Sequence, residues 1–368
     1  MEHRANLCCV ARRVWLYNAL MEKQNLENWR GKTLSSAVAG YDAFLLAEAA
    51  KTAQNDILYI VSNGVELEQT AEVVRYVNPN LPILTFPAWD TVPYDRVSPN
   101  VSVLSARLET LSEIAQNQNP KQARIIITSI GAAIQKLPPK KIFLNSRRVL
   151  KVGGKLIFND FMHYAAINGY TKVEQVMEAG EFAVRGDIID IFPTGALQPL
   201  RIDLFDEDIE KIRTFNPLNQ RTTGTLNEYV FGVANEVILD ANTIKNFRSA
   251  YREAFGTDSL KDEIYESVSN GRKYLGMENW LPYFYDEPLP TLFDYLPAAT
   301  VILGRNYEDA LQAKEESIVD YYTARLEALK IKNSAEETIY RPIKPELLYL
   351  NTDTFSALIT LKKPITLT

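Results

Sequence analysis

The sequence contains very little cysteine or histidine. Its two cysteines, Cys8 and Cys9, are adjacent, and His3 and His163 are the only histidines among 368 residues. Adjacent cysteines provide neither a disulfide framework nor the ligand spacing of a metal site. Two histidines leave little material for a Ser-His-Asp triad. We therefore expect reduced thiols, no metal centre and no hydrolytic triad.

Long apolar runs and an excess of positive charge are missing as well. No apolar stretch approaches the roughly 18 residues that a membrane-spanning helix needs, and the opening segment MEHRANLCCVARRVW lacks the apolar stretch of a secretory signal. The net charge is −6 and the sequence pI is about 5.3, whereas DNA-binding domains usually present a basic face or arm. These features predict a cytoplasmic protein and favour a protein partner over nucleic acid.

The first third of the chain alternates between helical and strand patterns. Helical patterns lie at Ala43–Lys51, Glu66–Tyr76 and Ser102–Gln116, and apolar runs of strand length lie at Ile57–Val61, Leu84–Phe86 and Arg124–Thr128. This alternation predicts a parallel sheet covered by helices on both faces. The segment Phe86–Pro99 holds several prolines and aromatics, so we expect an ordered surface loop there.

After Lys136–Pro139 the pattern changes to short strands. We expect strands at Lys155–Phe158, Thr171–Val176, Phe182–Phe192, Leu200–Phe205 and Ile209–Phe215, the last two joined by the turn Asp206–Asp208. Closely spaced strands with short turns predict a small antiparallel domain.

From about residue 218 the helical signal returns. Helical patterns lie at Asn242–Ala254, Leu260–Asn270 and Tyr307–Lys330, with one strand-like run at Thr300–Leu303. The predicted organisation is an α/β region over 1–135, an inserted β domain over 136–217, a region over 218–350 that completes the first core, and a C-terminal tail over 351–368.

Three segments carry a resemblance to a known family. The longest is Gly169–Pro193, where a basic residue follows Gly-Tyr and a Gly-x-Phe-x-x-Arg-Gly-x-x-x-Asp-Ile-Phe-Pro strand comes after it. The others are Gly276–Asn279 leading through Pro290–Pro297, and Phe86–Arg107 together with Thr128–Pro139. On these residues the chain resembles the amino-terminal, UvrB-like part of the bacterial transcription-repair coupling factors.

The resemblance implies a fold and a set of partners. The expected fold is a degenerate RecA-like parallel sheet, related to P-loop NTPases, with a small antiparallel β/α domain inserted that is similar to UvrB domain 2. In the family that domain binds UvrA, and the full-length protein is an ATP-dependent DNA translocase that acts on stalled RNA polymerase. Contacts with RNA polymerase and DNA are expected from downstream domains that lie outside this chain.

The Walker A motif that binds ATP phosphates is degenerate in this sequence. A Gly-rich loop with a lysine should precede the helix Ala43–Lys51, yet Leu34–Asp42 contains no lysine. Gly31–Thr33 spells the end of the motif, but Leu26 stands where its first glycine should be. We therefore interpret this match as accidental.

The Walker B motif is degenerate too. The strand Thr300–Leu303 runs into Gly304–Asn306 rather than into the Asp-Glu pair that holds Mg²⁺. The acidic Asp206–Asp208 lies in a predicted hairpin turn, where solvated side chains are the ordinary interpretation. We expect no catalytic residue, no metal and no cofactor; the alternative function is a DNA-binding helicase or ATPase domain of the UvrB type.

The aromatic hairpin with which UvrB holds damaged DNA has no counterpart here. Pro99 and Asn100 lead almost directly into the helix Ser102–Gln116, which leaves no room for it. Trp89 and Tyr94 could stack on bases, but we favour a role in anchoring the proline-rich loop.

The resemblance places the UvrA contacts at Lys172, Phe182 and Arg185. Lys172 and Arg185 occupy basic positions, and Phe182 could supply an apolar anchor. Arg185 has an alternative, structural interpretation, because it could pair with Asp187 or Asp190 to hold its strand. The sequence therefore predicts a non-catalytic module that recruits UvrA.

Overall fold

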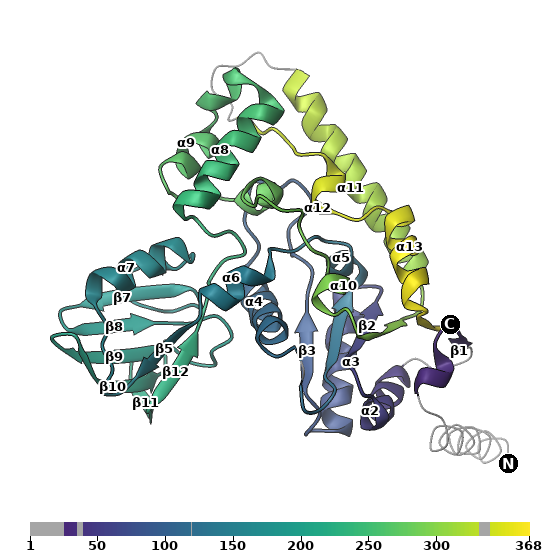
Figure 1. Ribbon diagram of the computed structural model, residues 1–368, viewed down its shortest axis with the longest axis horizontal. Coiled ribbons are helices and arrows are strands. Elements are labelled where there is room, and N and C mark those ends of the chain that lie inside the picture. The colour runs from purple at the N-terminus through teal and green to yellow at the C-terminus, as the bar shows by residue number, and fades with distance from the viewer. Residues whose placement is uncertain (1–25, 35–39, 119, 331–338) are drawn as a thin grey trace.

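The computed structural model describes residues 26–34, 40–118, 120–330 and 339–368 (Figure 1). Cys8, Cys9 and His3 lie outside the described residues, as does most of the loop between Leu34 and Asp42. A body built on a parallel sheet stands beside a smaller domain of antiparallel strands, and a layer of helices lies above both in this view.

The parallel sheet of the body has, within the described residues, six strands in the order β1-β14-β13-β2-β4-β3. They are β1 (Thr33–Leu34), β2 (Ile57–Val61), β3 (Ile83–Phe86), β4 (Ile125–Ser129), β13 (Thr300–Leu303) and β14 (Ile365–Leu367). Every residue of β2 and β4 is buried. Continuous apolar runs are typical of strands with both faces covered, and the predicted parallel α/β core is confirmed.

Helices cover both faces of this sheet. Alternate residues of β2 enter different cores: Leu58 and Ile60 one, Ile57 and Tyr59 the other. The second core contains the buried faces of α2 (Asp42–Thr52) and α3 (Gly64–Val77), whereas the first contains those of α4 (Val101–Gln116), α5 (Ile130–Ala133), α11 (Tyr307–Lys330) and α13 (Thr352–Lys362). The predicted helices of the first third are confirmed to within two residues.

Residues 351–368 do not form the tail that the sequence predicted. They form α13 and β14, and β14 lies between β1 and β13, with Ile365 paired to Ile302. The prediction is wrong because a three-residue strand gives no recognisable apolar period until the sheet supplies its neighbours.

The smaller domain, here called the β domain, contains a sheet with the strand order β11-β10-β9-β8-β7-β6 among the residues described. Its strands are β6 (Thr171–Lys172), β7 (Glu181–Arg185), β8 (Ile188–Ile191), β9 (Leu200–Phe205), β10 (Asp208–Phe215) and β11 (Thr222–Leu226). A short ribbon of β5 (Arg148–Lys151) and β12 (Glu228–Phe231) lies beside it. All pairs except the parallel β6–β7 are antiparallel.

Helix α7 (Phe158–Ile167) covers one face of the β domain sheet. Phe161 packs edge-on against Phe182 with ring centroids 5.7 Å apart, and the same core contains Ile189 and Ile202. The predicted strand Lys155–Phe158 is wrong, because Lys155 makes a single bridge and Phe158 begins α7. Apolar residues at 158, 161, 162 and 165 follow the helical period, which the strand interpretation overlooked.

The strands of the β domain continue past the boundary predicted at residue 217. β11 pairs with β10, and β12 pairs with β5, so the expected helical region begins with strands. The predicted Thr171–Val176 strand is shorter than expected and ends at Lys172. The division of the chain into domains stays a prediction.

The helical layer joins the two sheets. It contains α6 (Lys140–Asn145), α8 (Ala241–Phe255), α9 (Glu263–Ser269), α10 (Leu292–Tyr295) and α12 (Pro345–Leu348), together with the 3₁₀ turns η2 (Thr257–Lys261) and η3 (Met277–Tyr283). A further 3₁₀ turn, η1 (Leu26–Trp29), lies beside β1 at the edge of the parallel sheet. Asp240 begins α8 with a capping box, accepting from the N–H groups of Asn242 and Thr243.

Buried polar contacts fix the return connection from the β domain to the body. Arg107 of α4 and Glu236 are both fully buried and form a two-pronged ion pair, with Nε 2.5 Å from Oε1. Arg107 also donates to the carbonyl of Pro87 at 2.8 Å. A buried arginine requires this degree of satisfaction, so the connection is held in one arrangement.

Candidate protein-interaction site

The outer face of the β domain sheet, opposite α7, carries a cluster of charged side chains. Cross-strand partners project to the same side of a sheet, and the register aligns Asp190 with Arg201, Arg201 with Arg213, and Asp203 with Lys211. Arg185 lies on the same face, three residues beyond the inward-facing Phe182. We call this set the charged ladder: Arg185, Arg201, Lys211, Arg213, Asp190 and Asp203.

Asp190 is the centre of the charged ladder. It is 1% exposed and receives Arg201 Nε at 2.7 Å and Arg201 Nη2 at 2.8 Å. Arg201 also lies over the Phe215 ring, 4.4 Å from its centroid. Hydrogen bonding to Asp190 raises the pKa of Arg201 above its usual value. Arg201 therefore donates to both oxygens of the buried Asp190 carboxylate and stabilises its charge.

Arg185 is a second, more exposed partner of the same carboxylate. Its Nη2 lies 2.9 Å from Asp190 Oδ2, while its side chain is 52% exposed. The structural alternative for Arg185, pairing with Asp190, is thus observed in the structure. Because Arg201 already satisfies Asp190, Arg185 can leave this pair at small cost, since exposed ion pairs contribute only about 0–1 kcal/mol.

Cations outnumber carboxylates on the charged ladder. Arg213 pairs with Asp203 at 2.5 Å, and Lys211, directly opposite Asp203, is exposed. With Glu181 of the same face counted, four cations stand against three carboxylates, so the outer face keeps a small surplus of positive charge although the whole chain is acidic. Such a surface is complementary to an acidic partner.

The other two predicted contact residues do not join Arg185. Phe182 is 3% exposed and packs inside the β domain core, so its prediction as an exposed apolar anchor is wrong. Lys172 is exposed on the edge strand β6 and is aligned with Phe182, which directs it toward the α7 side. The sequence could not reveal this split, because it depends on the register of β6 against β7.

The carboxyl edge of the parallel sheet is where nucleotides bind in open α/β folds. Here Asp42, the first residue of α2, accepts from Arg305 Nη2 at 2.7 Å and from Tyr59 Oη at 2.9 Å. Burial, followed by the neighbouring Asp42, raises the pKa of Tyr59 well above its ordinary value. Negative charge is therefore already placed at the helix end that would face phosphates.

The segment Gly31–Thr33 starts a strand rather than a phosphate loop. The N–H of Gly31 donates to the carbonyls of Lys363 and Pro364, and Thr33 pairs with Thr366. Trp89 and Tyr94 are buried, with Tyr94 packed 5.6 Å from Tyr322. The prediction that they anchor the proline-rich loop is confirmed.

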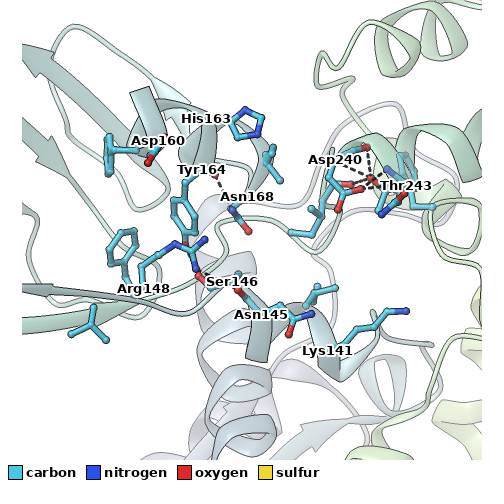
Figure 2. A pocket seen from close by; sticks show the side chains of 18 of the residues that line it. Lys141, Asn145, Ser146, Arg148, Asp160, His163, Tyr164, Asn168, Asp240 and Thr243 are labelled. Atoms are coloured by element: carbon cyan, nitrogen blue, oxygen red, sulfur yellow. Dashed lines mark hydrogen bonds between the residues drawn. The ribbon is translucent and has the colours of Figure 1, made fainter. Parts of the chain in front are cut away.

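A groove separates the β domain from the helical layer, and we call it the interdomain groove. Its volume is about 1040 Å³. Figure 2 shows Tyr164 of α7 and Asn168, just after that helix, on one side, Asn145 and Ser146 below them, and Asp240 and Thr243 on the opposite side. No sequence pattern predicted this groove, because its walls come from segments that are far apart along the chain.

The described residues show neither a membrane-spanning helix nor a metal-binding cluster. None of their helices is both long and apolar enough to span a bilayer, and they contain no group of three or more His, Cys, Asp or Glu side chains placed to hold a metal ion.

Comparison with known proteins identifies the β domain. The sequence model of the UvrB interaction domain matches residues 149–236, which run from the second residue of β5 past the end of β12 and therefore include the charged ladder.

Most of the chain is also similar to longer bacterial proteins. A transcription-repair-coupling factor of Rickettsia bellii is 34% identical over 306 residues, which are 83% of this chain and 27% of that protein. Those of Haemophilus influenzae and Escherichia coli are 33% identical over 78% of the chain and 32% identical over 71%. The chain spans only 22–27% of the length of these curated relatives.

Proposed function

The chain is homologous to transcription-repair-coupling factors over most of its length and contains a UvrB interaction domain, and from this premise we propose that it is a non-catalytic docking module for UvrA. In this proposal the β domain recruits UvrA, in the cytoplasm, to RNA polymerase that has stalled on DNA. The polymerase and DNA contacts belong to the longer protein.

The charged ladder supports this proposal more than any other observation. Arg185 is half exposed, and the buried carboxylate that it touches is already satisfied by Arg201. An arginine in this situation can exchange its internal partner for a carboxylate of another protein without leaving a buried charge unpaired. We therefore place the UvrA contact on the outer face, centred on Arg185.

Lys172 serves as the test of how far that contact extends. It lies on the edge strand β6 and is directed toward the opposite side of the sheet from Arg185. A partner that touches both residues must wrap around this edge. We keep Lys172 as a proposed contact, whereas buried Phe182 is no longer one.

The decisive measurement is the affinity of the purified chain for UvrA. We expect Arg185→Glu to weaken binding on the order of tenfold or more, because a charge-assisted hydrogen bond contributes about 1.5–3 kcal/mol. Lys172→Glu should weaken it as well. Lys330→Glu, on the exposed end of α11, changes net charge equally and should bind like the parent.

Two results would contradict the proposal. If the parent chain has no affinity for UvrA, the function is wrong. If Arg185→Glu and Lys172→Glu both melt like the parent and bind UvrA with unchanged affinity, the surface is wrong.

The alternative function, a DNA-binding helicase or ATPase domain, needs a nucleotide at the carboxyl edge of the parallel sheet. The ion pair between Asp42 and Arg305 does not favour nucleotide binding at this edge, because an aspartate at the start of α2 repels phosphate. Salt-sensitive DNA binding in a mobility-shift assay, together with Mg-ATP hydrolysis, would favour the alternative.

A further inference from the structure

We infer that the interdomain groove binds an extended acidic peptide segment of a partner protein, which adds as a strand to the free edge of β5. This inference does not depend on UvrA, because the groove lies away from the outer face that carries Arg185. Its support comes from the geometry of β5, from the charges of the groove walls and from their apolar surface.

β5 presents its edge, not a face, to the interdomain groove. Arg148, Val149 and Leu150 all line the groove although successive side chains of a strand point to opposite sides. The N–H of Val152 donates to Asn227, so residues 148, 150 and 152 share the edge that pairs with β12. The N–H and C=O of Val149 therefore point to the other edge, and neither has a backbone partner among the residues described.

An unpaired strand edge is a template for another strand. β5 pairs, within the described part of the chain, with β12 alone, and Val149 is 55% exposed. Backbone hydrogen bonds would supply affinity for any extended peptide. The side chains around the edge must then supply its specificity.

Positive charge enters the groove from both walls. Arg148 donates to the main-chain carbonyls of Asn145 at 3.5 Å and Arg147 at 3.1 Å, and stacks 4.8 Å from the Tyr164 ring. Among the described residues, both of its hydrogen bonds go to main-chain carbonyls rather than to a carboxylate. On the opposite wall Lys245 of α8 has neither a hydrogen bond nor an ion pair with the residues described. These two cations are free to pair with carboxylates.

The acidic residues of the groove are mostly occupied. Asp240 accepts from N–H groups at the start of α8, and Asp286 lies 3.6 Å from Lys141. Asp160, in the first turn of α7, is the remaining carboxylate of the lining and offsets one cation. When Lys141 and Lys155 are counted with Arg148 and Lys245, the lining holds four cations against three carboxylates, so the balance favours an acidic occupant over a basic one.

Apolar surface and an unsatisfied hydroxyl complete the groove. Val149 and Ile157 are 55% and 44% exposed on the β domain wall. Ser146 is 6% exposed, and its Oγ has no hydrogen-bond partner among the described residues. A volume near 1040 Å³ is at the upper end for small-molecule pockets, so it suits a peptide. Alternating apolar and acidic side chains would match these walls.

The probe is a fluorescein-labelled peptide that alternates valine and glutamate, compared with one that alternates valine and lysine. Fluorescence anisotropy should show saturable binding of the glutamate peptide, on the order of tenfold tighter than the lysine peptide. The double variant Arg148→Glu with Lys245→Glu should weaken it by at least about tenfold. Lys330→Glu should leave it unchanged.

Strand addition has its own matched pair of variants. Val149→Pro removes the N–H at the free edge without removing a bond to β12, because proline is tolerated where a strand N–H points outward. Val230→Pro makes the same change on β12, whose outer edge does not face the groove. We expect Val149→Pro to weaken peptide binding on the order of tenfold and Val230→Pro to bind like the parent, with both melting like the parent.

Three results would overturn the inference. The first is equal affinity for the two peptides. The second is equal binding by the correctly folded Val149→Pro and Val230→Pro variants, which would exclude strand addition. The third is displacement of the peptide by oligothymidine, if the oligothymidine binds more tightly than the peptide and the Arg148→Glu with Lys245→Glu variant no longer binds it. That result would assign the groove to nucleic acid.

Discussion

The body and the β domain use arginine–carboxylate pairs in different ways. In the body two buried carboxylates each depend on one arginine: Glu236 on Arg107 and Asp42 on Arg305. In the β domain two arginines share one buried carboxylate, Asp190, and the more exposed of them is Arg185. An arginine that alone compensates a buried carboxylate cannot leave it without destabilising the fold. An arginine that shares the carboxylate with a second arginine can leave it and bind a partner protein.

The largest effect that this comparison predicts is for Arg107. Replacing Arg107 with alanine leaves Glu236 fully buried without its counterion. We expect the free energy of unfolding to fall by about 3–5 kcal/mol, measured by urea denaturation. The double variant Arg107→Met with Glu236→Leu should recover most of that loss, because no buried charge remains. A loss below about 1 kcal/mol for Arg107→Ala would show that water or rearrangement compensates the carboxylate.

Replacing Arg305 tests whether its ion pair with Asp42 stabilises the fold or only blocks a nucleotide site at the carboxyl edge of the parallel sheet. Asp42 accepts hydrogen bonds from Arg305 and from the Tyr59 hydroxyl. Arg305→Ala removes the first of these two donors and keeps the second. We expect a loss of about 1.5–3 kcal/mol in the free energy of unfolding.

The nucleotide response of the same variant sharpens the comparison. A true site occupied at 100 times Kd would stabilise the protein by about 2.7 kcal/mol. We expect Mg-ATP to leave the melting temperature of both the parent and Arg305→Ala unchanged. Stabilisation of the variant alone would mean that the ion pair blocks a working site, and stabilisation of both would favour the ATPase alternative.

In the β domain the comparison predicts opposite consequences for two neighbouring arginines. Arg201→Ala should lower the free energy of unfolding by about 1–3 kcal/mol, since Asp190 then keeps a single bond from Arg185. Arg185→Ala should change it by less than about 1 kcal/mol yet weaken UvrA binding on the order of tenfold. Equal destabilisation by both variants would make Arg185 a structural residue and break the comparison.

Much of the fold follows from local patterns in the sequence. The strand Ile57–Val61 and the helix Val101–Gln116 were predictable, because a continuous apolar run and a helical period can be recognised in the local sequence without knowledge of the neighbouring elements. β14 and the two-residue β6 were not, since strands this short exist through their neighbours in the sheet. Local pattern thus predicts the elements that have a period of their own.

The candidate site was predictable only in part. Arg185 was found through its motif, but its partner Arg201 was not, because the two meet across three strands. The prediction of Phe182 as a contact residue overlooked strand geometry. Phe182 lies three residues before Arg185 on the same strand, and side chains three residues apart on a strand point to opposite faces. Alternation along Glu181–Arg185 was the signal that could have separated them.

The smallest predicted effect concerns a buried carboxyl that has no arginine at all. Glu278 is 1% exposed and accepts from Ser98 Oγ at 2.8 Å and Asn235 Nδ2 at 3.2 Å. Burial raises its pKa, and these hydrogen bonds offset part of the increase. Because the folded pKa lies above the unfolded one, the stability associated with the protonated form is fully present below the unfolded pKa and is lost as pH rises through the folded pKa.

Glu278→Gln removes this titration while keeping the shape of the side chain. From mildly acidic to neutral pH the parent should therefore lose more stability than the variant, as measured by urea denaturation at each pH. Glu327→Gln, on the exposed side of α11, provides the matched control and should follow the parent. A difference between parent and Glu278→Gln that stays constant over this range would mean that Glu278 is equally protonated in the folded and unfolded states. The body would then hold a buried charge at Glu278 without an arginine, unlike the buried carboxylates of Glu236 and Asp42.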